Sequence, residues 1–273
     1  MQIDNAFITR ILEPLKITVD EASKSIMDVY HKDTYDAETK SDGSPVTEAD
    51  NRSNEIIIKS LKNISNDIPI LTEEIYEKDL INTDIPYWLV DPLDGTKEFI
   101  NKSNDFTVNI ALIEDSKPIF GIIGAPATGK IWHGSHFNNS SNNHSAPEII
   151  RIVMSKSHQT EADKKFLDYI GSLNIKYEII EKGSSLKLCA LSDDQADIYP
   201  RFGPTSEWDI AAGHAVLNSF GGSILQMANS KTLGYSKKES ILNPSFIAFR
   251  NRALEETYMP ISVSYTHLRA HET

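Results

Sequence analysis

Two aspartates follow an apolar run in the stretch YWLVDPLDGTKEFI, residues 87–100. Asp91 and Asp94 stand three residues apart, whereas a simple turn would need only Asp94 followed by Gly95. Hard divalent cations such as Mg²⁺ prefer oxygen ligands and rarely need a cage built entirely of protein. A strand end that presents Asp91, the carbonyl of Leu93 and Asp94 can therefore bind one or two such ions.

The residues after the second aspartate suit a phosphate group. Gly95 and Thr96 leave backbone N–H groups free where a short helix is predicted to begin, and such groups bind phosphate. Acids at a strand end beside a helix start indicate metal-assisted transfer of a phosphoryl group to water. The alternative interpretation is a β-hairpin with solvated acids, because Asp-Gly turns are common.

Further acidic residues lie beside predicted element boundaries. They are Asp50 in TEAD, Glu73 and Glu74 after PILT, and Asp209 in SEWDIAAG. Thr47, followed three residues later by Asp50, forms a signal like a capping box and predicts the start of a helix. The stretch WDIAAGHAVLNSFGG is predicted to be a helix that is closed by its two final glycines.

Composition limits the partners and the location of the protein. The formal net charge of −12 argues against nucleic acid as a partner, because no basic patch would neutralise phosphates. The single cysteine, Cys189, excludes an internal disulfide and a thiolate metal cluster, and its apolar helical surroundings predict core packing. The chain lacks a signal-peptide pattern and any apolar run near 18 residues, which predicts a cytoplasmic protein without a transmembrane segment. Peripheral association with the inner face of the cell membrane stays open, and no oligomeric state is predicted.

The elements that must position these residues divide the chain into two predicted domains. Residues 1–144 are interpreted as an α+β domain in which helices pack on an antiparallel sheet that carries most of the metal ligands. Residues 145–250 alternate strand and helix, which predicts an α/β domain with parallel pairing that contributes Asp209. The low-complexity stretch FNNSSNNHSAP marks the boundary. Residues 251–273 resemble translated cloning sequence and are predicted to be a non-native or disordered tail.

The motifs occur together in one known family. SPVTEAD, TEE, DPLDGTKEF and WDIAAGHAV stand in the order found in the inositol monophosphatase superfamily of lithium-sensitive, magnesium-dependent phosphatases, and the resemblance runs from about Asp42 to Phe249. KEF after the Gly-Thr pair, GSSLKLC and YPRFGPTSEWD are more similar to its 3'(2'),5'-bisphosphate nucleotidase branch, in particular the bacterial CysQ-type enzymes. The chain departs from the pattern at Thr72, where Ser is usual, and in the tail after about residue 250.

The resemblance implies a fold and a metal site. The fold is α/β (α+β), a layered αβαβα sandwich of the inositol monophosphatase and fructose-1,6-bisphosphatase type, with the site between two domains. Two to three Mg²⁺ ions are implied. Glu73, preferred over Glu74, would hold the first with Asp91 and the carbonyl of Leu93. Asp91, Asp94 and Asp209 would hold the second, and a weaker third ion would lie near Glu73.

The resemblance also implies catalytic and substrate-binding roles. Asp50 would orient Thr96, whose hydroxyl would help to deprotonate the attacking water, and Glu73 completes the catalytic set. The phosphate would lie among Leu93, Asp94, Gly95, Thr96 and Asp209.

The nucleotide would be bound from the second domain. His158, Ser184, Lys187 and Arg201 are the implied contacts to the base, the ribose and the second phosphate. Each of these residues can also have an ordinary structural role, because a helical lysine is usually solvated and a histidine in SKSH can simply end a strand. His133, His136 and His144 have no metal-ligand spacing and are predicted to lie on the surface.

The function predicted on this resemblance is a cytoplasmic Mg²⁺-dependent phosphatase of sulfur metabolism. It would convert adenosine 3',5'-bisphosphate to AMP and phosphate, and so clear that nucleotide after sulfate assimilation or sulfotransfer. One alternative is an inositol-phosphate or fructose-bisphosphate phosphatase on the same scaffold. The other is a non-catalytic metal or nucleotide sensor, against which the complete set of acids argues.

Overall fold

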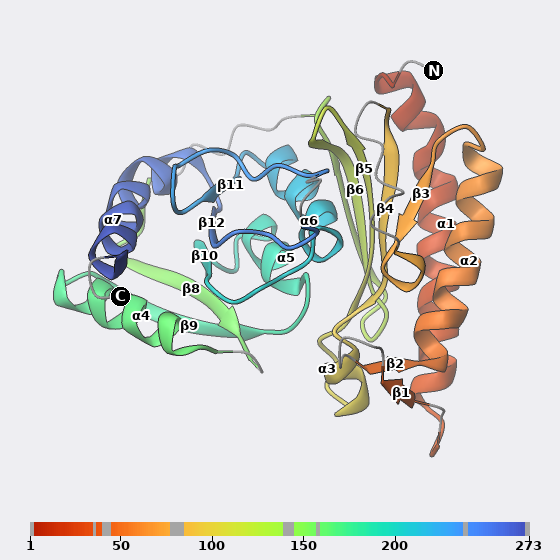
Figure 1. The fold of residues 1–273 in the computed structure, drawn as a ribbon, viewed down its shortest axis with the longest axis horizontal. Coiled ribbons are helices and arrows are strands. Elements are labelled where there is room, and N and C mark those ends of the chain that lie inside the picture. Colours follow the sequence, from red (N-terminus) through yellow and green to blue (C-terminus); the bar gives the residue numbers. More distant parts are fainter. Residues whose placement is uncertain are drawn as a thin grey trace.

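The first part of the chain forms two long helices against a sheet. The computed structural model describes residues 3–34, 37–39, 45–76, 85–138, 145–156, 159–236 and 240–270. Helices α1 (Asn5–Tyr30) and α2 (Glu48–Ile64) bury apolar stripes against one face of this sheet (Figure 1). Helix α1 is capped by Asp4, whose carboxylate accepts a hydrogen bond from the backbone N–H of Phe7 at 2.8 Å.

The first sheet has the strand order β3-β4-β5-β6-β7. Its strands are β3 (Ile70–Thr72), β4 (Tyr87–Asp94), β5 (Thr107–Glu114), β6 (Lys117–Ala125) and β7 (Lys130–Ser135). The predicted antiparallel pairing is confirmed from β4 to β7, whereas β3 runs parallel to β4. Both faces of the sheet are covered, and for this reason β4, β5 and β6 are apolar without alternation. Short elements around the site are β1 (Ala37–Thr39), β2 (Pro45–Thr47), η1 (Glu73–Ile75) and α3 (Thr96–Ile100).

The second sheet has the strand order β11-β12-β10-β8-β9. Its strands are β8 (Ile149–Ser155), β9 (Lys176–Lys182), β10 (Ile198–Arg201), β11 (Ser223–Gln226) and β12 (Phe246–Phe249). The predicted parallel pairing is confirmed for β8 with β9 and with β10. Strand β12 instead runs antiparallel to both of its neighbours. Helices α4 (Glu161–Ser172) and α7 (Arg252–Ala270) lie on the outer face of this sheet (Figure 1).

Helix α6 (Glu207–Ser219) lies with α5 (Leu186–Ser192) between the two sheets (Figure 1). Its residues are buried almost all round, from Trp208 in the first turn to Leu217 near the end, as expected for a helix covered on every side. It approaches β6 closely enough that a Cβ atom at Gly121 would fall inside van der Waals contact of the carbonyl oxygen of Ala212. Helices, sheet, helices, sheet and helices thus form five layers, which confirms the predicted αβαβα sandwich.

The prediction of a disordered tail is wrong for residues 252–270, which form α7. Leu254, Tyr258, Met259 and Tyr265 recur at helical spacing and are buried in one cluster with the second sheet. The hydroxyl of Tyr265 donates a hydrogen bond to the carbonyl oxygen of Ala162 at 3.0 Å. Despite its unusual composition, this segment therefore forms an amphipathic helix. Residues 271–273 lie outside the described chain, and the non-native origin of the tail stays a prediction.

The predicted domain boundary lies between the two sheets in sequence. Strand β7 ends at Ser135 and β8 begins at Ile149, but residues 139–144 lie outside the described part of the chain. Because α6 of the second half packs on the first sheet, the halves share a core. The division at residues 144 and 145 stays an interpretation. Within the described ranges, no helix combines the length and the hydropathy needed to cross a membrane.

The close approach of α6 to β6 can be tested by Gly121→Ala. We expect this variant to lose about 2–3 kcal/mol of unfolding free energy, because backbone on both sides of the added methyl group must move. Gly171→Ala is the matched control. It lies in α4 with no atom within 4 Å of the added Cβ, so it should be neutral or stabilising by about 0.5–1 kcal/mol. Urea denaturation measures both, and equal stability of the two variants would contradict the packing described.

Candidate active site

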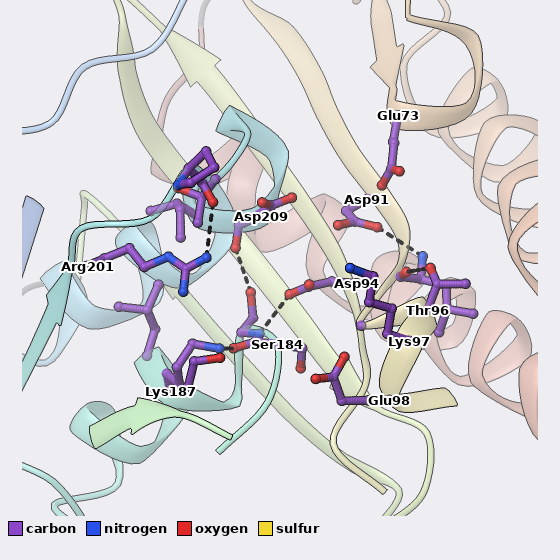
Figure 2. A pocket seen from close by; sticks show the side chains of 18 of the residues that line it. Glu73, Asp91, Asp94, Thr96, Lys97, Glu98, Ser184, Lys187, Arg201 and Asp209 are labelled. Carbon is purple, nitrogen blue, oxygen red and sulfur yellow. Dashed lines mark hydrogen bonds between the residues drawn. The ribbon is translucent and has the colours of Figure 1, made fainter. Parts of the chain in front are cut away.

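A cavity of about 350 Å³ lies where the end of β4 meets the starts of α3, α5 and α6 (Figure 2). Acidic side chains from the first half line one side of it, and Lys187 and Arg201 from the second half line the opposite side. Every predicted site residue except Asp50 and His158 lines this cavity. His158 lies outside the described residues, and Asp50 is buried directly behind the wall.

A β-bulge brings the two aspartates of DPLD onto one face of β4. In a regular strand, residues three apart point to opposite faces. Here Asp91 stands opposite Asn109 and Asp94 stands opposite Thr107, so β4 uses three steps where β5 uses two. The extra residue reverses the alternation for the remainder of the strand, and both carboxylates point into the cavity (Figure 2).

Three carboxylates from both halves of the chain form a compact cluster. Oxygen atoms of Asp91, Asp94 and Asp209 all lie within 4.8 Å of one another. Burial raises the pKa of each carboxyl group. The charge of Glu73 raises the pKa of Asp91 further, and the charge of Asp94 does the same for Asp209. A cluster of hard oxygen donors with uncompensated negative charge fits a divalent cation such as Mg²⁺.

Glu73 extends the cluster from η1. Its half-buried side chain lines the cavity and points toward Asp91, whereas Glu74 does not line the cavity (Figure 2). This arrangement supports the preference for Glu73 as the ligand. The hydroxyl of Ser53 donates a hydrogen bond to the carbonyl of Pro92 at 2.7 Å and so anchors the bulge to α2.

Asp209 is held in place by the first turn of α6. One of its oxygens accepts a hydrogen bond from the backbone N–H of Ser206 at 2.8 Å, as part of a capping box. The hydroxyl of Ser185, at the start of α5, donates to the carbonyl of Asp209 at 2.7 Å. The position of this carboxylate is therefore a direct consequence of how the two central helices begin.

Asp94 is positioned by groups from both halves. It accepts hydrogen bonds from the backbone N–H of Ser185 at 2.7 Å and from the side-chain amide of Asn109 at 3.3 Å. These bonds and the nearby charge of Lys187 lower the pKa of Asp94, but burial outweighs them and leaves it raised.

Thr96 and Asp50 are in contact, as the predicted roles require. The Thr96 hydroxyl lies 3.1 Å from one carboxylate oxygen of Asp50 and 3.2 Å from the carbonyl oxygen of Leu93. The other Asp50 oxygen accepts hydrogen bonds from the backbone N–H and the hydroxyl of Thr47, at 2.7 and 2.6 Å. Burial raises the pKa of Asp50 despite these bonds. Asp50 is thus fixed by the capping box of α2 and can accept one hydrogen bond from Thr96.

The turn before α3 requires glycine. Gly95 has φ +92°, and a Cβ there would lie 3.0 Å from the carbonyl oxygen of Asp105. Ser184 packs against the same turn and also adopts a left-handed backbone, with φ +42°. The predicted phosphate-binding site therefore lies where the turn at Gly95, from the first half, meets the turn at Ser184, from the second half.

The cationic side of the cavity is built by Lys187 and Arg201. Lys187 is buried, which lowers its pKa to about 8, and its amino group donates to the carbonyl of Ser184 at 2.7 Å. Arg201 donates one hydrogen bond to the carbonyl of Pro204 at 3.0 Å, while its buried Nε has no hydrogen-bond partner among the described residues. Both side chains can therefore still bind an anion in the cavity.

Some residues of the cavity were not predicted from the sequence. Ser185, Lys97, Glu98, Tyr199 and Thr205 all line it. No sequence pattern indicates the role of the backbone N–H of Ser185, since its hydrogen bond to Asp94 depends on tertiary contact. The surface position of His133 and His136 and the burial of Cys189 are confirmed. His144 lies outside the described residues.

The comparisons with known proteins agree on one family. A family model described as inositol monophosphatase family matches residues 9–267. The chain is 39% identical over 246 residues to the 3'(2'),5'-bisphosphate nucleotidase CysQ of Salmonella typhimurium, covering 86% of this chain and 98% of that protein. It is also 39% identical over 239 residues to the protein of that name from Escherichia coli strain K12, covering 82% and 94%. The crystal structure of CysQ from Bacteroides thetaiotaomicron has a TM-score of 0.77 at 30% identity, covering 88% of this chain and 97% of that chain.

The raised pKa values predict how metal and pH act on stability. Without a cation, the folded protein retains protons on Asp91, Asp94 and Asp209 that the unfolded chain loses near pH 4. The unfolding free energy of the metal-free protein should therefore fall as the pH rises above about 4 through the raised pKa values. Since the cation binds the ionised carboxylates, saturating Mg²⁺ should raise the melting temperature more at about pH 8 than at about pH 5.

Asp209→Asn is the matched variant for this measurement. It removes one charge, so the metal-free form should be at least as stable as the wild type, and the shift caused by Mg²⁺ should shrink. Thermal unfolding of both proteins with and without Mg²⁺ provides the test. A Mg²⁺ shift that is equal at both pH values, or unchanged in Asp209→Asn, would show that the cluster is not the metal site.

Proposed function

The chain belongs to the inositol monophosphatase family, and on this premise we propose that it is a Mg²⁺-dependent 3'(2'),5'-bisphosphate nucleotidase that converts adenosine 3',5'-bisphosphate to AMP and phosphate. The observation that carries the proposal is the division of one cavity into an acidic side and a cationic side. A substrate with two phosphates can place one against each. The activity class is that of a phosphoric monoester hydrolase, as in its relatives.

The acidic side would hold the metal and the phosphate that is removed. Glu73, Asp91, Asp94, Asp209 and the carbonyl of Leu93 would bind two to three Mg²⁺ ions. When bound, Mg²⁺ supplies positive charge that offsets these acids and stabilises the negative charge of the transferring phosphoryl group. The backbone N–H groups of the Gly95 turn would bind phosphate oxygens.

Thr96 and Asp50 would move the proton of the attacking water. As the water oxygen forms its bond to phosphorus, the ester P–O bond breaks and the water proton passes to the Thr96 oxygen. The released ribose oxygen takes a proton from solvent water. The Thr96 proton passes to Asp50, 3.1 Å away, whose raised pKa suits it to accept a proton. Glu73 would assist as a ligand of Mg²⁺, whose positive charge would favour loss of the water proton.

The cationic side would select the nucleotide. Arg201, with an unpartnered buried Nε, can bind the 5'-phosphate through two parallel hydrogen bonds, and Lys187 adds a second charge. Ser184 and His158 complete the proposed contacts to ribose and base. An inositol monophosphate carries no second phosphate for the cationic side, which is why we favour the nucleotidase over an inositol monophosphatase. The similarity to the nucleotidases named CysQ favours it over a fructose bisphosphatase, whose substrate also carries two phosphates. The intact acidic cluster disfavours a non-catalytic sensor.

Sulfur metabolism is the setting proposed for this reaction, with a cytoplasmic location and adenosine 3',5'-bisphosphate as the small-molecule partner. The net charge of −12 is consistent with the absence of a nucleic-acid partner.

Thr96→Val tests the proton path. Removing the hydroxyl should lower kcat by roughly 100-fold or more while the Mg²⁺ concentration for half-maximal rate stays unchanged, because Thr96 is not a ligand of the cluster. Phosphate release as a function of Mg²⁺ concentration gives both values. Thr96→Ser keeps the hydroxyl and should recover most of the rate. A loss of Mg²⁺ affinity with normal kcat would instead make Thr96 a structural element of the turn.

Arg201→Ala tests substrate selection. The wild type should hydrolyse adenosine 3',5'-bisphosphate with far higher kcat/KM than inositol 1-phosphate. The variant should lose roughly 30-fold or more on the nucleotide alone, since it leaves one phosphate without its charged partner. Arg252→Ala, which removes an exposed arginine of α7, should change neither value. Comparable wild-type efficiency on both substrates, or equal losses on both in Arg201→Ala, would favour the sugar-phosphatase alternative.

A further inference from the structure

Glu98 is an acidic residue of the cavity to which the metal site and the proton path assign no role. It lies on α3, two residues after Thr96, and lines the cavity although only 6% of its surface is exposed (Figure 2). Its side chain is packed beneath a glycine, because a Cβ at Gly183 would lie 3.1 Å from the Glu98 Cγ. The side chain is therefore held by packing as far as its Cγ atom, and the carboxylate lies at the cavity wall.

The Glu98 carboxylate accepts no hydrogen bond and forms no ion pair within the described ranges, while its oxygens are not sealed from the cavity. Its charge is close enough to oppose ionisation of Asp94 and to favour the charged form of Lys187. A carboxylate that is desolvated in this way costs free energy unless a donor reaches it. In a cavity built for phosphates it also repels the substrate's charge, so the donor must come from an uncharged part of the substrate.

The position of Glu98 restricts which substrate group that can be. If the proposed function holds, the scissile phosphate lies at the Asp94–Thr96 turn, one helical turn or less from Glu98. The phosphates of the bisphosphate are acceptors, so its donors are the ribose hydroxyl beside the scissile ester and the amino group of adenine. The hydroxyl is on the carbon next to the ester, whereas the amino group lies across the base from the ribose. The hydroxyl is therefore the donor near enough to the turn.

We propose that Glu98 accepts a hydrogen bond from the ribose hydroxyl vicinal to the scissile phosphate and is a specificity-determining residue for the ribonucleotide. This inference rests on the proposed function and refines it. A vicinal pair of oxygens can exchange roles: with the phosphate on the 3'-oxygen the donor is the 2'-hydroxyl, and with the phosphate on the 2'-oxygen it is the 3'-hydroxyl. One carboxylate can then serve both regioisomers.

The test compares adenosine 3',5'-bisphosphate with its 2'-deoxy analogue, which lacks only the proposed donor. We expect the wild type to prefer the ribonucleotide in kcat/KM by about tenfold or more, the usual effect of one hydrogen bond to a charged group. Glu98→Ala should lower kcat/KM for the ribonucleotide to about the level of the deoxy analogue, and should leave the analogue unchanged or improved because the repelling charge is gone. Glu98→Gln keeps an acceptor oxygen and should fall between them.

One control variant and one fallback variant make the outcome decisive. Glu178→Gln removes an exposed carboxylate on β9 outside the cavity and should preserve the wild-type preference. If Glu98→Ala does not fold, the wild-type preference and Glu98→Gln still decide the question. Equal kcat/KM on both substrates in the wild type would overturn the proposal. Equal losses of kcat/KM on both substrates in the Glu98 variants would also overturn it, because Glu98 would then act through Lys187 or the turn. A wild type that hydrolyses neither bisphosphate would instead refute the proposed function.

Discussion

The burial of α6 between the two sheets is the constraint on which the site depends. The helix is covered on both sides, and its close contact with β6 at Gly121 leaves it little freedom to slide or rotate. Its first turn carries Asp209, which reaches the end of β4 only because the helix axis is fixed in this way. The packing of α6 on the first sheet, at a distance from the reacting groups, thus brings Asp209 of the second half next to Asp91 and Asp94 of the first half.

The site brings several carboxylates together in a place where water cannot solvate them well. Hydrogen bonds from backbone N–H groups orient Asp50, Asp94 and Asp209. Asp50 and Asp209 are both third residues of capping boxes, so one oxygen of each is bound by its own helix start. The other oxygen remains free for the cavity or for Thr96. Asp94 is fixed in a similar way by the backbone N–H of Ser185. These bonds set direction without neutralising charge, which keeps the carboxylates strong ligands and leaves the metal-free cluster destabilising.

Much of the fold and most of the acids could be predicted from the sequence because their signals are local. Apolar runs, capping residues and turn glycines located the strands and helices, and the DPLDGT motif identified the cavity wall. The bulge in β4 could not be predicted, because alternation along a strand gives no sign of a register shift that appears only against β5. The hydrogen bond from Ser185 and the carboxylate of Glu98 depend on contacts between distant segments. Helix α7 differs from the predicted tail for another reason, because the unusual composition of this segment obscures the helical spacing from Leu254 to Tyr265.

The order of the layers along the chain has a consequence for synthesis on the ribosome. The inner face of the first sheet is covered by α6, which begins 72 residues after β7 ends, and the outer face of the second sheet is covered by α4 and by α7, which follows β12. Two apolar sheet faces therefore stay uncovered until α6 and α7, which follow later in the chain, have been synthesised. The nascent chain therefore passes through a period in which these two apolar faces are exposed to water, until α6 has formed and α7 can pack on Phe166.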